Sequence, residues 1–339
     1  MRIETYIPGL SKNTIEIAKH AESLGYDALV SGELNNEPFL PVMLGLEHTK
    51  LIVRTGLAIA FPRSPMVVAN MGWDLQSYSN GRFQLGLGTQ VKGHNERRFS
   101  VPWSPPAPRM REYILALKAI WHSWKTGETL DFQGEHYTHT LMTPMFTPPP
   151  MESNPPPIYV SGLGPGMAKI AGEVADGLLL HPMCSREYIK KIIVPAVKKG
   201  AAKSKRDPSE CELLWGGFIA TGESEGELQQ AKRNIAARIS FYASTRTYRP
   251  ALDFHGWGEV NEELHKLSVK EEWEAMFELI TDDIVDTLAF CGTGTQVAKS
   301  LRDDLGSFCS AVMWNEIEHL GFDHTQDDRM SELIEIVKS

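Results

Sequence analysis

Two glycine-rich segments carry the clearest signals for ligand binding in this sequence. One follows the apolar run 158–160, precedes the helical run 168–175 and reads Ser161-Gly162-Leu163-Gly164-Pro165-Gly166-Met167. A strand, a glycine turn and a helix N-terminus together bind phosphate, because free backbone N–H groups and the positive end of the helix dipole face the ligand. The other segment, at 81–90, ends in Gly86-Leu87-Gly88-Thr89-Gln90 and also permits close backbone approach. Alone it more often marks an ordinary turn, so the stronger prediction is an anion site at 161–167.

Neither segment matches a known nucleotide signature. The glycines of 162–166 have the spacing GxGxG in mid-chain, and no acidic residue closes a unit of about 30 residues as in dinucleotide-binding folds. The lysine of a phosphate-binding P-loop is missing as well. The sequence therefore gives no support to nucleotide hydrolysis.

Four side chains are candidates for acid or base chemistry: Glu33, His94, His181 and His255. Glu33 and His181 fall at the predicted carboxyl ends of strands, where barrel enzymes place their chemistry. A carboxylate can orient or accept a proton, and a histidine exchanges one near neutral pH with little tuning. Structural roles compete with these: an ion pair for Glu33, and a strand cap for His181, which precedes Pro182.

Eight short apolar runs, rich in β-branched residues and separated by helical periodicity, predict the elements that position these groups. Such alternation is typical of a parallel sheet with crossover helices. The chain of 339 residues exceeds the roughly 250 residues of a bare barrel. We therefore expect a (β/α)8 TIM barrel with insertions, and a doubly wound sheet is the alternative. The predicted strands are 3–7, 28–33, 51–61, 83–89, 158–162, 177–182, 213–221 and 310–315.

Helix signals and breaks indicate one domain over residues 1–339. Helices are predicted from Ser11 to Gly25, over 65–78 with Pro65 in the first turn, and over 109–124. Seven prolines in 143–157 predict an extended connection at the midpoint of the chain. The segment 245–268 has little periodicity, and we expect an inserted loop that covers or shapes the active site.

Composition and charge restrict the partners. The net charge is −9, whereas nucleic acids and anionic membranes bind clustered positive charge. No apolar run approaches the roughly 18 to 20 residues of a spanning helix, and a secretory pattern is absent from the start of the sequence. The four cysteines lack the spacing of a metal or redox site and are expected to be buried thiols. We expect a cytoplasmic protein that binds a small molecule, with no nucleic acid, membrane or metal.

Over most of its length the sequence resembles the luciferase-like flavin and deazaflavin oxidoreductases. Each motif is degenerate alone, but their order and spacing together are specific. The subgroup that it resembles most uses the deazaflavin coenzyme F-420. The family motifs are Gly25-Tyr26-Asp27, Glu33 with Pro38-Phe39, Thr55-Gly56, Arg63-Ser64-Pro65, 79–88, 109–113, 132–135, 157–160 and Ala175-Asp176-Gly177, and those of the subgroup are Gln90-Val91-Lys92, Arg97-Arg98-Phe99, Phe241-Tyr242, His255-Gly256-Trp257 and Gly292-Thr293.

The resemblance implies a set of cofactor-binding residues. In this superfamily a non-prolyl cis peptide backs the middle ring of the cofactor, and alignment on Arg63 puts it at Gly56-Leu57. Thr89, Gln90 and His94 would line the other flank. The ribityl phosphate would lie at the turn where the residues themselves predict an anion site, at Ser161, Gly162, Gly164, Pro165, Gly166 and Met167.

Two departures bear on the substrate. Sugar-phosphate dehydrogenases of the superfamily carry an acidic residue in a GTGE turn, whereas this chain has Gln90-Val91 after Thr89. They also carry an Asp-His pair after the second strand, where this chain has Glu33-Leu34. The resemblance therefore argues against a sugar-phosphate dehydrogenase.

The leading hypothesis is an oxidoreductase that transfers a hydride between coenzyme F-420 and a small organic substrate, with Glu33, His94 and His181 as catalytic candidates. The alternative is a monooxygenase that binds FMN, uses oxygen and depends on a partner flavin reductase. A cofactor carrier without turnover is a third hypothesis, against which the two glycine turns argue. The resemblance also implies a homodimer.

Overall fold

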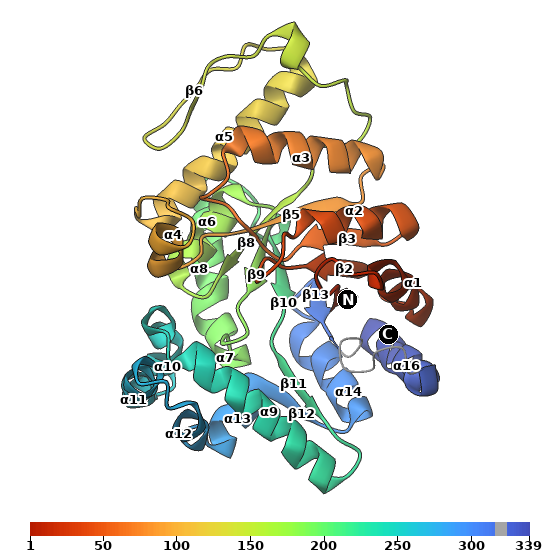
Figure 1. Ribbon diagram of the computed structural model, residues 1–339, viewed down its shortest axis with the longest axis vertical. Helices are drawn as coiled ribbons and strands as arrows, with labels where there is room; N and C mark the ends of the chain where they lie inside the picture. Colours follow the sequence, from red (N-terminus) through yellow and green to blue (C-terminus); the bar gives the residue numbers. More distant parts are fainter. Residues whose placement is uncertain (316–323) are drawn as a thin grey trace.

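Eight parallel strands close into a barrel that is surrounded by helices (Figure 1). The computed structural model describes residues 1–315 and 324–339. Each barrel strand pairs with the next one along the chain, and the last pairs with the first. This closure confirms the predicted (β/α)8 TIM barrel over the doubly wound sheet, which leaves two open edges. The barrel strands are β1 (Arg2–Tyr6), β2 (Ala28–Ser31), β3 (Ile52–Thr55), β5 (Phe83–Gly88), β8 (Ile158–Gly162), β9 (Gly177–Leu180), β10 (Glu212–Trp215) and β13 (Ala311–Met313).

All eight predicted runs contain a barrel strand, but two of them divide. The run 51–61 forms β3 and the short β4 (Ala58–Ile59), on either side of Gly56-Leu57. The run 213–221 forms β10 and β11 (Phe218–Thr221), which are separated by Gly216-Gly217, and glycine weakens a strand at such a point. β11 leaves the barrel and pairs in parallel with β12 (Ala289–Gly292). The sequence does not predict β12, because its four residues include no β-branched side chain.

The three predicted helices are present, with ends that follow from their sequences. α1 (Thr14–Leu24) ends at Gly25, whose φ of 96° favours glycine. α3 (Pro65–Tyr78) begins after Ser64, whose side chain accepts a hydrogen bond from the Met66 N–H. α5 (Pro106–Thr126) buries the face that carries Ile114, Leu117 and Trp121. Other helices of the outer layer are α2 (Phe39–His48), α6 (Pro165–Val174), α8 (Val194–Lys203), α14 (Gly294–Leu305) and α16 (Asp327–Lys338).

Buried polar groups make up part of the barrel strands' packing. The Arg54 guanidinium forms an ion pair with the Glu4 carboxylate, and each side chain is only 2% exposed. Burial raises the pKa of Glu4, although the charge of Arg54 opposes the shift. The Glu212 carboxylate accepts hydrogen bonds from Arg2 and from the Tyr159 hydroxyl, both at 2.7 Å. Removing one member of such a pair would leave an uncompensated buried charge.

The segment 245–268 is largely helical, which corrects the expectation of an irregular loop. It holds a 3-10 turn (η4, Arg246–Tyr248), α10 (Arg249–Phe254) and most of α11 (Gly258–Val269). The helices are short and are interrupted at Gly256, whose φ is 80°, so no apolar stripe extends far enough to be recognised. They belong to a helical excursion between β11 and β12 that also contains α9 (Glu225–Ala243), α12 (Trp273–Glu278) and α13 (Asp282–Leu288).

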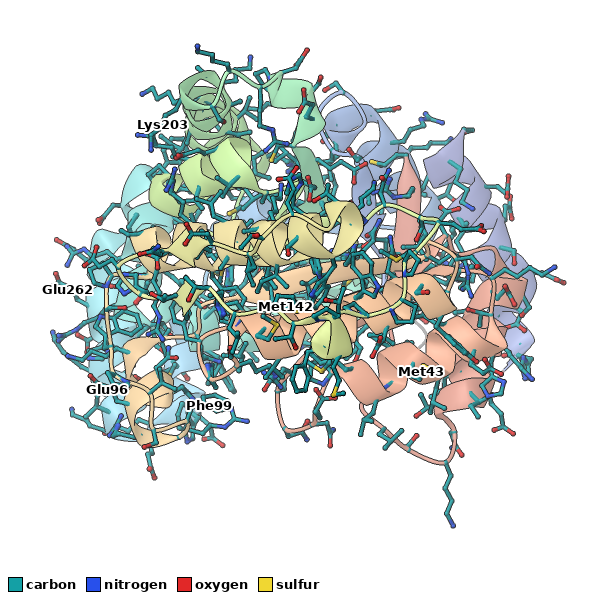
Figure 2. The ribbon with its side chains drawn as sticks, turned by 90° about the horizontal axis from the view of Figure 1, so that it is seen from above. Met43, Glu96, Phe99, Met142, Lys203 and Glu262 are labelled. Carbon is teal, nitrogen blue, oxygen red and sulfur yellow. The ribbon has the colours of Figure 1, made fainter. Side chains whose placement is uncertain are left out.

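The connection between α5 and β8 is mostly extended, as its prolines predict. It includes the antiparallel pair β6 (Phe132–Gln133) and β7 (Thr138–His139) and one 3-10 turn (η1, Pro144–Phe146). Met142 lies over α5, where the Trp124 Nε1–H approaches its sulfur at 3.3 Å (Figure 2). Among the described residues, no helix combines the length and the hydropathy that crossing a bilayer requires.

Candidate active site

A bulge at the end of β3 contains the cis peptide Gly56-Leu57, as the resemblance predicts. Close packing fixes this backbone. A Cβ atom on Gly56 would lie 2.1 Å from Val30 Cγ1, and one on Gly88 would lie 2.4 Å from Leu57 Cδ1. Both distances are too short for a real side chain. The two glycines therefore allow β2 and β5 to enclose the bulge and leave the Leu57 side chain in place over Gly88.

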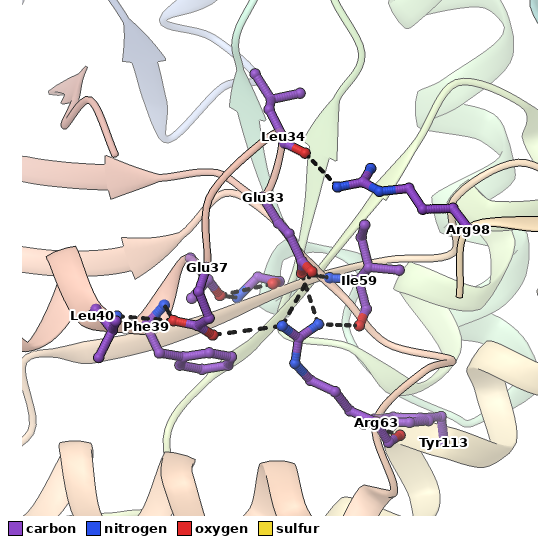
Figure 3. Close-up of polar contacts among 11 residues, drawn as sticks. Glu33, Leu34, Glu37, Phe39, Leu40, Ile59, Arg63, Arg98 and Tyr113 are labelled. Atoms are coloured by element: carbon purple, nitrogen blue, oxygen red, sulfur yellow. Dashed lines mark hydrogen bonds and ion pairs between the residues drawn. The ribbon is translucent and has the colours of Figure 1, made fainter. Parts of the chain in front are cut away.

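The Glu33 carboxylate is bound to the backbone and the arginine that follow the bulge (Figure 3). One oxygen accepts hydrogen bonds from the Ile59 N–H and from Arg63 Nη1, both at 2.7 Å. The other accepts one from Arg63 Nη2 at 3.1 Å, and the Glu33 N–H donates to the Leu57 carbonyl at 3.0 Å. The side chains of Glu33 and Arg63 are only 8% and 18% exposed. Glu33 therefore forms an ion pair with Arg63, which is the structural alternative to a catalytic role for this residue.

The turn between β8 and α6 has the geometry of an anion site. Gly164 is the N-cap residue of α6 and offers no side chain to the first-turn N–H groups, which the helix itself leaves free. A Cβ atom on Gly164 or Gly166 would meet no heavy atom within 4 Å, so the space beside both residues is open. Ser161 and Met167, which flank the turn, are half-buried. The predicted residues thus form an accessible N-terminus with a positive helix dipole.

The end of β5 turns into a short helix, α4 (Lys92–Arg97). Thr89 and Gln90 are half-buried, and Gln90 has a φ of 56°. Asn95, which is fully buried, donates from Nδ2 to the carbonyls of Thr89 at 2.9 Å and Val91 at 3.2 Å. The sequence reasoning missed Asn95, because one asparagine in a polar run has no periodic signal. His94 is exposed on the same helix.

His181, at the end of β9, stands in an aromatic environment. Its Nδ1 accepts a hydrogen bond from the Met183 N–H at 3.2 Å, which places the proton of the neutral ring on Nε2. The ring centroid lies 4.3 Å from that of Tyr248 and 5.0 Å from that of Tyr242. Burial lowers the pKa of His181 to about 3. Burial also raises the pKa of Tyr248 to about 12, so both groups are neutral near pH 7.

The helical excursion reaches this strand end through a second contact. Ser185 Oγ and His255 Nε2 lie 2.8 Å apart, and the His255 ring stacks on Trp257 at 4.7 Å. His255 thus joins the excursion to the segment after β9. Figures 1 and 2 agree that α4 and α11 lie on the same side of the molecule, where Figure 2 labels Glu96 and Glu262.

The candidate residues fall into two groups that the described contacts do not join. Glu33 belongs with the bulge at Gly56-Leu57, and Arg98 Nη2, just after α4, donates to the Leu34 carbonyl at 2.7 Å (Figure 3). His181 belongs with Tyr242 and Tyr248. In the parts of the chain that the structure describes, no hydrogen bond or ring contact links Glu33, His94 and His181 to one another.

Comparisons with known sequences show the family to which the chain belongs. The family described as "Luciferase-like monooxygenase" matches residues 7–307. An uncharacterized protein of Mycobacterium tuberculosis is 45% identical over 304 residues, 89% of each chain. A 5,10-methylenetetrahydromethanopterin reductase of Archaeoglobus fulgidus is 23% identical over 307 residues, 88% of each chain. An F420-dependent glucose-6-phosphate dehydrogenase of Gordonia bronchialis is 29% identical over 213 residues, which cover 58% of this chain and 60% of that one.

Solved structures share the fold across the whole chain. The coenzyme F420-dependent tetrahydromethanopterin reductase of Methanopyrus kandleri superposes with a TM-score of 0.75 at 19% identity, over 99% of this chain and 96% of that one. The EDTA monooxygenase of Chelativorans sp. superposes with a TM-score of 0.74 at 14% identity, over 100% of this chain and 93% of that one. At such identities the likeness concerns the fold alone. Because the family match spans most of the sequence, this chain belongs to the luciferase-like monooxygenase family.

Proposed function

We propose that this chain is an oxidoreductase that transfers a hydride between the deazaflavin coenzyme F-420 and a small organic substrate. The observation that carries the proposal is the open glycine turn at the N-terminus of α6, directly after the barrel strand β8. A relative with F420 in its name, the glucose-6-phosphate dehydrogenase of Gordonia bronchialis, favours the deazaflavin over FMN. When bound, the deazaflavin supplies two-electron hydride chemistry and the protein supplies position.

The residues at the carboxyl ends of the strands fit such a cofactor. The N–H groups of the turn at 161–167 would hold a phosphate, and the open space beside Gly164 and Gly166 accepts its oxygens. Gly56-Leu57 would back the ring system, with Thr89, Gln90 and the exposed His94 along the other flank. Lys92 and Arg97 on α4 are exposed and available to an anionic tail.

His181 has the properties of a hydrogen-bond donor toward the substrate. Its neutral ring carries the proton on Nε2, and a carbonyl or similar acceptor beside it would be polarised without proton transfer. Tyr242 and Tyr248 would pack against the apolar part of the substrate. We assign Glu33 a positioning role instead, because Arg63 and the Ile59 N–H engage both of its oxygens.

The alternative is an FMN-dependent monooxygenase that receives reduced flavin from a partner reductase and uses oxygen. The observation in its favour is the turn at 161–167 itself, because a helix N-terminus binds the phosphate of either cofactor. The two hypotheses differ in the ring that binds next to Gly56-Leu57 and in the reaction with oxygen.

The deciding experiment is a side-by-side titration of the purified protein with oxidised coenzyme F-420 and with FMN, followed by calorimetry. We expect micromolar binding of the deazaflavin and much weaker binding of FMN. The reverse preference, together with rapid formation of a peroxyflavin when reduced FMN-loaded protein meets oxygen, would overturn the proposal in favour of the monooxygenase. Binding of neither cofactor would overturn both.

A matched pair of variants tests the location of the phosphate. Gly164→Ala adds a methyl group to open space, so the fold tolerates it while the anion site is narrowed. Gly226→Ala adds the same group to open space in the first turn of α9. We expect Gly164→Ala to weaken cofactor binding on the order of tenfold, the equivalent of about 1.4 kcal/mol, and Gly226→Ala to leave it unchanged. Equal affinities would move the phosphate site elsewhere.

A further inference from the structure

A cluster of two histidines and one aspartate joins the first helix of the barrel to the last. His20 Nε2, from α1, lies 2.8 Å from an oxygen of Asp327, the first residue of α16. His324 Nδ1, from the 3-10 turn η5 (His324–Gln326), lies 2.7 Å from the other oxygen. The two rings meet edge to face at 4.5 Å. None of these residues takes part in the candidate active site.

The donor set matches the preferences of a divalent transition metal. One ligand atom from each residue lies within 4.8 Å of the other two. Two imidazole nitrogens and a carboxylate oxygen are common ligands of Zn²⁺, with bonds of about 2.0 to 2.2 Å, which separates tetrahedral ligands by roughly 3.3 Å. His20 Nε2 and His324 Nδ1 now lie 2.8 and 2.7 Å from different oxygens of Asp327, so the side chains must rotate to share one ion through a single oxygen.

His20 is the buried member of the cluster. Its side chain is 6% exposed, and its Nδ1 has no hydrogen-bond partner among the described residues. Asp327 is therefore its polar contact, and Nε2 is the ring atom that faces the cluster. Metal binding needs a lone pair on Nε2, so the ring proton of His20 must lie on Nδ1 when the ion is bound. The His324 side chain is 64% exposed, which leaves the outer side of the cluster open to solvent.

We propose that His20, His324 and Asp327 form a site for a divalent transition metal ion, Zn²⁺ above all. The ligands are His20 Nε2, His324 Nδ1 and one oxygen of Asp327, and water completes the tetrahedron on the exposed side. The ion links α1 to α16, two helices that already pack against each other. A bound ion therefore stabilises the docking of the last helix on the barrel, independently of the cofactor.

The test uses full-length, untagged protein that has been treated with a chelator and dialysed, because a histidine tag would itself bind metal. Calorimetric titration with ZnCl₂ should show one ion per chain, and thermal unfolding should show a rise in Tm with added Zn²⁺. The His324→Gln variant should lose tenfold or more in affinity and most of the rise in Tm, since loss even of an outer-shell partner costs roughly 10 to 100-fold. His324 is exposed, so this variant should fold.

The matched control is His122→Gln. His122 pairs with Glu128 at 3.0 Å on the surface, and no third metal ligand joins them among the described residues. This variant should bind Zn²⁺ like the parent protein. Asp327→Asn should resemble His324→Gln. With Co²⁺ in place of Zn²⁺, the parent should show the visible absorption bands of a four-coordinate ion, and both variants should lose them. Equal Zn²⁺ affinity in the parent and His324→Gln, or no one-to-one binding in the parent, would overturn the proposal. The Zn²⁺ affinity, the Tm and the Co²⁺ spectrum can all be measured without the cofactor and without turnover.

Discussion

Burial determines which single residues can exchange protons at the barrel mouth. His181 and Glu33 are both at strand ends, and the sequence alone makes both of them acid or base candidates. In the fold, burial lowers the pKa of His181 to about 3, so a protonated imidazolium is not formed near pH 7. Glu33 uses both oxygens to hold Arg63 and the Ile59 N–H. Neither residue is poised for simple proton transfer, which is consistent with chemistry supplied by the cofactor.

The shifted pKa of His181 predicts acid sensitivity. In the unfolded chain this ring titrates near its ordinary value of 6.5, and in the folded protein near 3. Between those values the unfolded chain binds more protons, so the free energy of unfolding falls as the pH drops through this window and is unaffected above it. The side chain of His181→Gln cannot titrate. In urea unfolding, the free energy of unfolding of this variant should therefore fall by up to about 2 kcal/mol less than that of the parent between about pH 7 and about pH 5.

The parent protein provides the comparison for that measurement. If His181→Gln follows the parent between about pH 7 and about pH 5, then burial does not keep the His181 ring neutral in the fold. Its assigned role as a neutral Nε2–H donor would then be wrong.

At the scale of elements, the junction of β3, β4 and β5 couples strand packing to the proposed cofactor site. Gly88, the last residue of β5, lies under the Leu57 side chain of the bulge. Gly88→Ala would place a Cβ 2.4 Å from Leu57 Cδ1, so the leucine must move. Overpacking of this kind costs about 1–3 kcal/mol. We expect Gly88→Ala to remain folded and to weaken cofactor binding on the order of tenfold or more.

Calorimetry and thermal unfolding of Gly88→Ala separate the two effects. Gly226→Ala, whose added methyl group enters open space, should match the parent in both measurements. Parent-like affinity in Gly88→Ala would show that Leu57 does not border the cofactor. A large drop in Tm with unchanged affinity would assign the contact a purely structural role.

The elements also show how far the sequence predicts the structure. The barrel strands, the glycine turn before α6 and the ends of α1 and α3 follow from local patterns, such as β-branched runs, Gly25 and Ser64. The cis bulge follows only from the family resemblance, because glycine in a strand has several uses. The helices of 245–268 and the contact of Tyr248 with His181 escape prediction, since they depend on packing between segments far apart in the sequence. Asn95 escapes for the same reason.

At the scale of the whole molecule, exposed apolar side chains on α2 and α3 favour the homodimer that the family resemblance implies. Leu40 is 53% exposed, Val67 52% and Tyr78 52%. The two helices are adjacent, because the Tyr78 hydroxyl of α3 donates to the Glu47 carboxylate of α2. Isolated exposed apolar residues are normal on any protein surface, so the family resemblance, and not their exposure alone, carries the expectation of a dimer.

We predict that two copies of the chain associate through this α2/α3 face. Light scattering should then give twice the chain mass of 37.9 kDa. The charge in Val67→Glu would be buried without a partner in the dimer but stays solvated in the monomer, so this variant should shift the equilibrium toward monomer. Leu141→Glu, at a residue that is 78% exposed on the connection between α5 and β8, should remain dimeric. A monomeric parent would refute the dimer. If Leu141→Glu disrupts the dimer and Val67→Glu does not, the interface lies on the connection between α5 and β8 instead.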